Sequence, residues 1–226
     1  MTYDTAARLT EILLALSFIQ QGLEHLVRFR KEQILFGVRI TLSLLVIAGL
    51  GGPWPLVGLA LSSLVFLQRF QGPYNGGSDR MGLLALWCLT ASRLLPGLKA
   101  QEVAFGYLGA QLILSYFISG WVKVLNPDWR SGRALRDVFQ FSTYPVTEDL
   151  RRWADRPWVM LAMSWAVMLF ELIFPLSLFS QPSLIVALVI AASFHLANAC
   201  LFGLNRFFWT WLSVYPAILW LQGRIF

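Results

Sequence analysis

Charged residues are scarce in this chain. Only 13% of its 226 residues are Asp, Glu, Lys or Arg, and 57% are hydrophobic, whereas soluble domains contain roughly 25% charged residues. A soluble protein of this length could not bury so much apolar surface, so the composition excludes a water-soluble fold. The sequence therefore predicts an all-α, integral membrane protein.

Cysteine and histidine are also rare. The two cysteines, Cys88 and Cys200, lie in apolar runs, which argues against a disulfide framework or a zinc site. The two histidines, His25 and His195, are too few for a histidine-rich metal or haem site. The H-E-x-x-H, G-x-S-x-G and C-x-x-C signatures are absent. We therefore predict no metal site, and no nucleic-acid partner because no aqueous domain presents the basic clusters.

Eight apolar segments follow one another along the chain, several of them shorter than the ~20 residues that an upright membrane helix needs. They cover residues 9–27, 34–50, 54–68, 81–96, 103–125, 157–179, 183–203 and 206–222. Polar residues interrupt the first segment, so two arrangements remain open for it: a membrane span, or a helix that lies at the interface or packs inside the bundle. The pattern predicts a polytopic helical bundle of about eight transmembrane helices in a single domain, residues 1–226.

Basic residues are distributed unevenly between the two sides of this bundle. When the loops are assigned to alternate sides, one side receives twelve basic residues: Arg28, Arg30, Lys31, Arg69, Arg80, Arg130, Arg133, Arg136, Arg151, Arg152, Arg156 and Arg206. The other side receives four: Arg8, Arg93, Lys99 and Arg224. The positive-inside rule makes the first side cytoplasmic. Arg39 and Lys123 lie within predicted spans.

The longest connection, residues 126–157, is on the cytoplasmic side. It contains Leu135, Val138, Phe139 and Phe141 among arginines. This pattern predicts an amphipathic helix at the level of the lipid headgroups, with anchoring as its simplest role.

Lys123 is a cation in an otherwise apolar helix. Tyr116, Ser119, Gly120 and Lys123 share one helical face, where small residues leave room beside the amine. The helix should end about one turn later, because Pro127 disfavours the helical conformation at the residue before it. Two interpretations remain open: a lysine that snorkels to the headgroups, or a functional amine in a protected site.

Glu171 lies in the middle of a predicted span. An ionised carboxylate is costly there, so we expect it to face the protein interior and to be paired or protonated. Pro175, four residues later, removes a backbone hydrogen bond and should kink the helix. His195 and Asn198 are three residues apart and therefore neighbours on one helical face. We predict an interior polar site built from these side chains together with Lys123.

A glycine-rich loop, RFQGPYNGGSDRM (residues 69–81), leads into the fourth segment. Its glycines, proline and asparagine predict a sharply folded loop, and Ser78 or Asp79 could cap the next helix. A phosphate-binding loop would need a lysine after the glycines, and none is present. Because this loop lies on the same predicted side as Asp128, we expect Asn75, Asp79 and Asp128 to help close the polar site.

Three stretches of the sequence together resemble one family. They are YNGGSDRMGLLALW, YFISGWVKVLNPDWRSGRAL and FHLANACLFGLNRFFWTWL, and FELIFPLSLF fits the acidic helix between the second and third. They look like the horizontally transferred transmembrane (HTTM) family, which is the membrane part of vitamin K-dependent gamma-glutamyl carboxylase and its bacterial relatives. The resemblance is strongest over residues 70–220 and implies a multi-pass protein of the bacterial inner membrane.

The resemblance also implies a role for Lys123. In the animal carboxylase, the matching lysine deprotonates reduced vitamin K, so a quinone or quinol is the implied cofactor. We therefore predict that the catalytic residues are Lys123, Glu171 and His195, and that the cofactor-binding residues are Asn198, Tyr116, Asn75, Asp79 and Asp128. Gly77 stands where the carboxylase-type histidine would be, so we do not expect glutamyl carboxylation itself.

Two functions of different classes remain open. The first is a membrane enzyme that uses a lipophilic quinol-type cofactor and a lysine base to modify a peptide or a small substrate. The second is a non-catalytic membrane subunit that scaffolds a protein or peptide partner, or helps its maturation or export, as some bacterial relatives of the family do. Membrane lipids are expected partners in either case.

Overall fold

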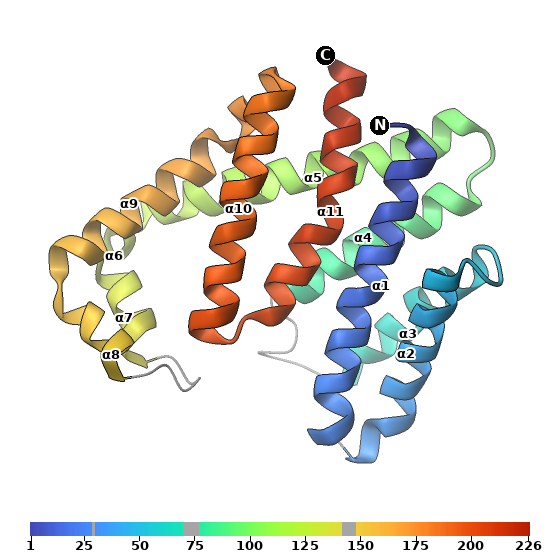
Figure 1. Cartoon of the computed structure of the whole chain (residues 1–226), viewed down its shortest axis with the longest axis horizontal. Coiled ribbons are helices and arrows are strands. Elements are labelled where there is room, and N and C mark those ends of the chain that lie inside the picture. The colour runs from blue at the N-terminus through green and yellow to red at the C-terminus, as the bar shows by residue number, and fades with distance from the viewer. Residues whose placement is uncertain (29, 70–76, 142–147) are drawn as a thin grey trace. The chain divides into compact units, whose positions relative to one another are not determined.

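A computed structural model describes the chain except for residues 29, 70–76 and 142–147 (Figure 1). The described residues form helices and turns, and no strand occurs among them. The all-α prediction is thus confirmed for this part of the chain. The chain divides into two compact units: residues 1–110 with 205–225 form unit 1, and residues 111–204 with Phe226 form unit 2.

Unit 1 is built around the N-terminal helix. Its elements are α1 (Tyr3–Arg28), η1 (Arg30–Glu32), α2 (Gln33–Ala48), α3 (Trp54–Arg69), α4 (Gly77–Leu94), the start of α5 (Leu98–Leu125) and α11 (Asn205–Ile225). Helix α1 packs against α2, α4 and α11, and α4 also packs against α3 (Figure 1).

The first apolar segment is an inner helix. Ala6 and Leu14 of α1 are buried, and the acidic side chain of Glu11 is neutralised inside the unit. Glu11 accepts hydrogen bonds from Arg8 at 3.1 Å and from Arg93 at 2.6 Å. The structure shows this segment packed against neighbouring helices with Glu11 paired, whereas the buried Thr10 hydroxyl has no hydrogen-bond partner among the described residues.

Unit 2 consists of the end of α5 and the elements that follow it. These are α6 (Pro127–Arg130), α7 (Arg133–Phe141), α8 (Glu148–Arg151), η3 (Arg152–Asp155), α9 (Pro157–Ile173), η4 (Phe174–Phe179) and α10 (Gln181–Phe202). Helix α5 ends before Pro127, and the Asn126 side chain accepts a hydrogen bond from the Asp128 amide at 2.9 Å. The α-helical part of α9 ends at Ile173 and continues as the 3₁₀ segment η4, so the predicted disruption near Pro175 is confirmed.

The predicted amphipathic helix in the long connection is α7. Leu135 and Phe139 are buried, whereas Val138 and Phe141 are exposed. The two buried side chains pack in a cluster of protein residues: Ala154, Met160 and Phe202. The helix is therefore amphipathic as expected, but its most buried residues contact the protein core and not the headgroups.

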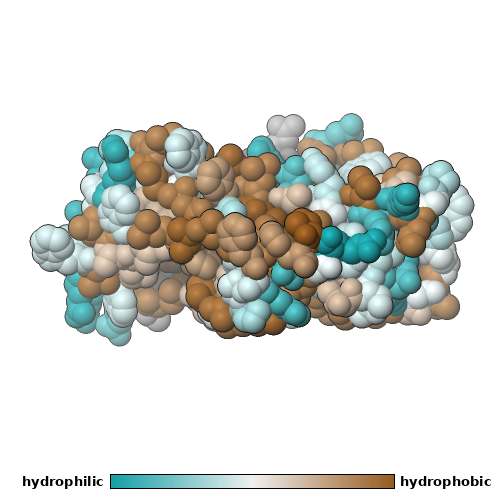
Figure 2. Space-filling view, turned by 90° about the horizontal axis from the view of Figure 1, so that it is seen from above, coloured by the Kyte–Doolittle hydropathy of each residue, from teal (hydrophilic) through white to brown (hydrophobic). Residues whose placement is uncertain are grey.

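Three of the described helices are long and apolar enough to cross a membrane. They are Leu98–Leu125 with a mean hydropathy of 1.4, Pro157–Phe179 with 2.0 and Gln181–Phe202 with 2.2. All eight predicted segments coincide with helices, but the others are shorter or more polar. Figure 2 shows hydrophobic side chains over much of the face it displays, as expected for a protein whose surface contacts lipid.

Candidate functional site

Lys123 on α5 and Glu171 on α9 form a buried ion pair. The Lys123 Nζ lies 2.5 and 2.6 Å from the two carboxylate oxygens of Glu171, and the side chains are 18% and 5% exposed. Ser119 accepts a hydrogen bond from Nζ at 2.8 Å and donates one to Glu171 at 3.1 Å. The amine thus turns toward α9 and not toward the surface. This supports a protected amine over a snorkelling one, and confirms that Glu171 is paired.

Two glycines allow the helices that carry this pair to approach closely. A Cβ at Gly120 would lie 2.8 Å from the backbone nitrogen of Leu172 and 2.9 Å from the Cβ of Glu171. Gly132, between α6 and α7, has a φ of +78°, and a Cβ there would lie 2.8 Å from the backbone nitrogen of Leu161. Only glycine fits at such contacts, so backbone packing against α9 sets the distance between Lys123 and Glu171.

Side chains of α9 also fix the turn that follows α5. Ser164 donates a hydrogen bond to the Trp129 carbonyl at 2.5 Å, and the Trp165 indole donates to the Arg130 carbonyl at 3.1 Å. The Lys123 Nζ lies 5.2 Å from the centroid of the Trp129 ring, within the range of a cation–π interaction. The amine is therefore held on one side by a carboxylate and on another by an aromatic face.

A second polar contact lies on the same face of α5. The Tyr116 hydroxyl is 3.0 Å from His195 Nε2, and both side chains are buried. The Tyr116 ring packs against Phe174, with centroids 4.2 Å apart, and Phe170 is 6.1 Å away. Tyr116 and Lys123 are seven residues apart, which is about 10 Å along a helix axis. An uncharged contact to α10 and a charged contact to α9 therefore share one helical face.

The remaining predicted residues of unit 2 have other neighbours. Asn198 is half-buried on α10, and its backbone carbonyl accepts a hydrogen bond from the Leu204 amide at 3.3 Å, just past the helix end. Asp128 is half-buried on α6 and forms an ion pair with Arg133 at 2.7 Å. These contacts of Asn198 and Asp128 are separate from the Lys123–Glu171 pair.

The predicted residues of the glycine-rich loop belong to unit 1 or are not described. Asp79 forms an ion pair with Arg206 at 3.0 Å, a partner 127 residues away that no local pattern indicates. Ser78 and Asp79 lie in the first turn of α4, which begins at Gly77. They are therefore inside the helix and not at the capping position predicted for them. Asn75 lies outside the described residues.

Two residues contribute to the Lys123 cluster in ways the sequence analysis missed. The sequence predicts Ser119 only as a small residue on the Lys123 face of the helix. In the structure, its hydroxyl forms hydrogen bonds with both the amine and the carboxylate. Its spacing of four residues from Lys123 is the signal that could have indicated this contact. Trp129 had no assigned role, and a lysine near an aromatic residue just past a helix end is too common a pattern to single it out.

The Lys123–Glu171 pair can hold one proton between an amine and a carboxylate. Its net charge is zero whether the proton is on Lys123 or on Glu171, and a neutral pair is less costly to bury than a single charge. The arrangement is therefore suited to acid–base chemistry in an apolar environment.

A model of the family described as HTTM domain matches residues 99–221, more than half of the 226-residue chain. The matched range includes every residue of the Lys123–Glu171 and Tyr116–His195 contacts. Comparisons with curated proteins and with solved structures each gave no match.

Proposed function

The chain belongs to the HTTM domain family, and on that premise we propose that it is a multi-pass membrane enzyme whose acid–base group is the Lys123–Glu171 pair. The observation that carries this proposal is the buried contact of 2.5 and 2.6 Å between the lysine and both carboxylate oxygens. Three helices meet the length and hydropathy needed to cross a bilayer. The proposal extends this to about eight spans in a bacterial inner membrane.

In this proposal, the pair exchanges a proton with a hydroxyl group of a bound molecule. When the shared proton is on Glu171, the Lys123 amine has a free lone pair and accepts the incoming proton at Nζ. The pair then carries one net positive charge, which stabilises the negative charge left on the oxygen. Ser119 keeps the amine and the carboxylate aligned through its two hydrogen bonds.

The aromatic side chains beside the pair support an aromatic alcohol, such as a quinol, as the bound molecule. Phe170, Phe174 and Tyr116 offer aromatic packing, which favours a flat apolar ring. The Tyr116–His195 contact adds polar atoms farther along the same face of α5. A bound quinol would supply a dissociable hydroxyl and two reducing electrons for modification of a peptide or a small substrate. Lys123 and Glu171 would hold its proton, and Tyr116 and His195 would orient its ring.

Asn198 is a further candidate to contact such a ligand, since it follows His195 by three residues on α10. Asp79 and Asp128 fit the role less well, because arginines already engage their carboxylates. The proposal therefore places cofactor binding on α5, α9 and α10.

Equilibrium dialysis of the purified full chain in mild detergent against a radiolabelled short-chain quinol tests this function. The wild type should bind about one quinol per chain, and the double variant Lys123→Met/Glu171→Gln should bind little. The double variant removes both charges together, so it leaves no unpaired buried charge and should retain near-normal stability. Lys99→Met, which changes an exposed lysine at the start of α5, is the matched control and should bind normally.

The same close packing of α5 on α9 at Gly120 favours a second candidate function, a non-catalytic membrane subunit. In that case the ion pair clamps two helices and has no chemical role. The wild type and the double variant would then both fail to bind quinol, and both would co-purify with the same protein or peptide partner in a fixed ratio.

A further inference from the structure

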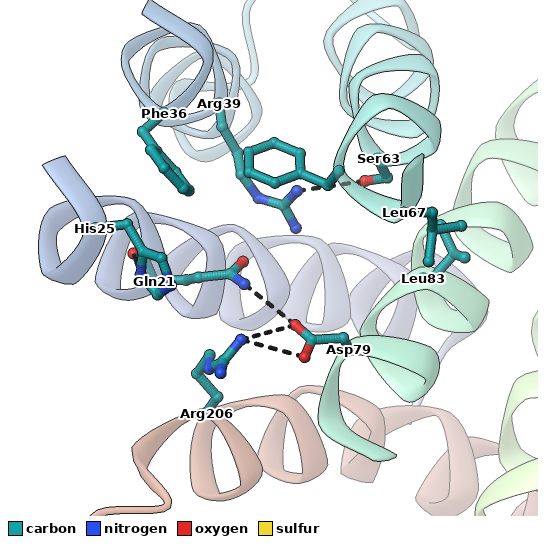
Figure 3. Close-up of a pocket in the computed structure, with 10 residues that line it drawn as sticks. Gln21, His25, Phe36, Arg39, Ser63, Leu67, Asp79, Leu83 and Arg206 are labelled. Atoms are coloured by element: carbon teal, nitrogen blue, oxygen red, sulfur yellow. Dashed lines mark hydrogen bonds and ion pairs between the residues drawn. The ribbon is translucent and has the colours of Figure 1, made fainter. Parts of the chain in front are cut away.

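A second cluster of charged and polar side chains surrounds a small cavity within unit 1. The cavity has a volume of about 40 Å³, and polar residues from five helices line it: Gln21 and His25 of α1, Arg39 of α2, Ser63 of α3, Asp79 of α4 and Arg206 of α11. Figure 3 shows these side chains pointing toward one another. All of them belong to unit 1, and only Arg206 lies within the range matched by the family.

Arg39 is a buried cation with few polar contacts. The residue is 5% exposed, and its hydrogen bond to the Ser63 hydroxyl is long, at 3.5 Å. The guanidinium lies 3.9 Å from the centroid of the Phe18 ring and 4.5 Å from that of Phe66. Its Nε atom has no hydrogen-bond partner among the described residues. A buried arginine ordinarily has a carboxylate partner, because an unpaired charge is costly to bury.

The carboxylate that lines this cavity, Asp79, is already engaged by other side chains. Both oxygens of Asp79 accept hydrogen bonds from Arg206, at 3.0 and 3.1 Å, and one also accepts from Gln21 at 3.1 Å. Asp79 and Arg206 carry opposite charges and form an ion pair at 3.0 Å, so together they add no net charge to the cluster. The cluster therefore carries one net positive charge, located on Arg39.

We propose that this cavity binds a carboxylate group. A single negative charge would balance the net charge of the cluster, and the Arg39 guanidinium, which lines the cavity, would donate a hydrogen bond to one of its oxygens. A water molecule needs roughly 10–15 Å³ of such space, so the cavity has room for a group as small as a carboxylate. A phosphate carries a second negative charge, which the cluster would not balance.

The ligand is either a free small carboxylate or the carboxylate end of a lipid-soluble acid. Phe36, Leu67 and Leu83 also line the cavity, and these side chains accept a methyl group or the start of an alkyl chain. The two sources share the same charge recognition by Arg39, and a competition experiment separates them.

The test is equilibrium binding of radiolabelled formate to the purified full chain in mild detergent. The wild type should bind about one formate per chain. Arg39→Met should bind it about ten- to a hundredfold more weakly, since hydrogen bonds to charged groups are worth about 1.5–3 kcal/mol. Asp79→Asn should bind formate several-fold more tightly, because it removes the negative charge beside the site.

Arg224→Gln is the matched control, because Arg224 also belongs to unit 1 but already has a carboxylate partner, Glu102, at 2.5 Å. It should bind formate as the wild type does. Displacement of formate by laurate, with no displacement by methyl laurate, would identify a lipid-soluble acid as an accepted ligand. Displacement by acetate but not by laurate would restrict the site to small acids.

Two results would overturn the proposal. One is a wild-type chain that binds no formate, which does not depend on whether any variant folds. The other is unchanged formate binding by folded Arg39→Met. In either case, Arg39 would be a structural cation held by the rings of Phe18 and Phe66.

Discussion

Lys123 in unit 2 and Arg39 in unit 1 are both cations on apolar helices, but they have opposite surroundings. Lys123 has a dedicated carboxylate within 2.6 Å, whereas the Asp79 carboxylate, which lines the same cavity as Arg39, is engaged by another arginine. The comparison shows that burying a cation does not by itself define its role. A paired lysine forms a neutral unit that can exchange a proton, whereas an uncompensated arginine, which keeps its proton, attracts an anion.

Removal of the Glu171 carboxylate should lower the free energy of unfolding more than any other change proposed below. Glu171→Leu would leave Lys123 partly buried and uncompensated, which makes it resemble Arg39. We expect a loss of about 3–5 kcal/mol in the free energy of unfolding, measured by denaturation in mixed micelles. Lys123→Met/Glu171→Gln should recover most of this loss. If the double variant is as unstable as Glu171→Leu, the lost packing and not the unpaired charge is responsible.

Separation of the two helices should weaken the lysine pair without changing its charges. Gly120→Ala places a methyl group against the α9 backbone, and overpacking of this kind costs about 1–3 kcal/mol. Gly37→Ala in α2 is the matched control, since a Cβ there meets nothing within 4 Å, and it should be neutral or slightly stabilising. Equal thermal stability of the two variants would show that α5 and α9 do not approach as described.

The uncharged Tyr116–His195 contact, on the same face of α5 as Lys123, shows how much a hydrogen bond without a charge contributes to stability. Tyr116→Phe removes the hydroxyl bonded to His195 and should cost about 1 kcal/mol, the typical value for a neutral hydrogen bond. Thermal unfolding of this variant can be compared directly with that of Glu171→Leu. A cost as large as that of the charged variant would contradict the distinction between the two contacts.

A carboxylate introduced at Ser63 should give Arg39 an ion-pair partner. In the structure, the Ser63 hydroxyl oxygen lies 3.5 Å from an Arg39 guanidinium nitrogen. Ser63→Asp would therefore place a carboxylate beside the guanidinium. We expect little net change in stability, because the attraction offsets the cost of burial, and loss of formate binding. Ser213→Asp introduces a carboxylate at another buried serine and should lose at least about 2 kcal/mol. Retained formate binding in Ser63→Asp would separate Arg39 from the anion site.

The sequence predicted the helices better than their partners. Each of the eight apolar segments coincides with a helix, since hydropathy and the prolines at 127 and 175 act locally. The sequence also identified Glu171 as a costly residue that should be paired or protonated, and Lys123 as a cation in an apolar helix. It could not pair them, because the contact depends on how closely α5 packs against α9 at Gly120.

The Arg39 cluster was even less accessible to sequence analysis. Arg39 was recognised as a cation within a predicted span, but its lack of a carboxylate follows from a contact between Asp79 and Arg206, which are 127 residues apart. Hydropathy and charge spacing describe single helices. Neither pattern predicts which helices contact each other in the folded protein. The sequence identifies individual residues of both sites, but tertiary packing determines which of them are in contact.

The most direct test of the account is to measure the redox lipid that the protein carries through purification. Lipid extraction and mass spectrometry should find close to one quinone-type molecule per chain in the wild type and close to none in Lys123→Met/Glu171→Gln. A wild type without redox lipid, or equal amounts in both proteins, would contradict the assignment of the Lys123–Glu171 pair as the functional site.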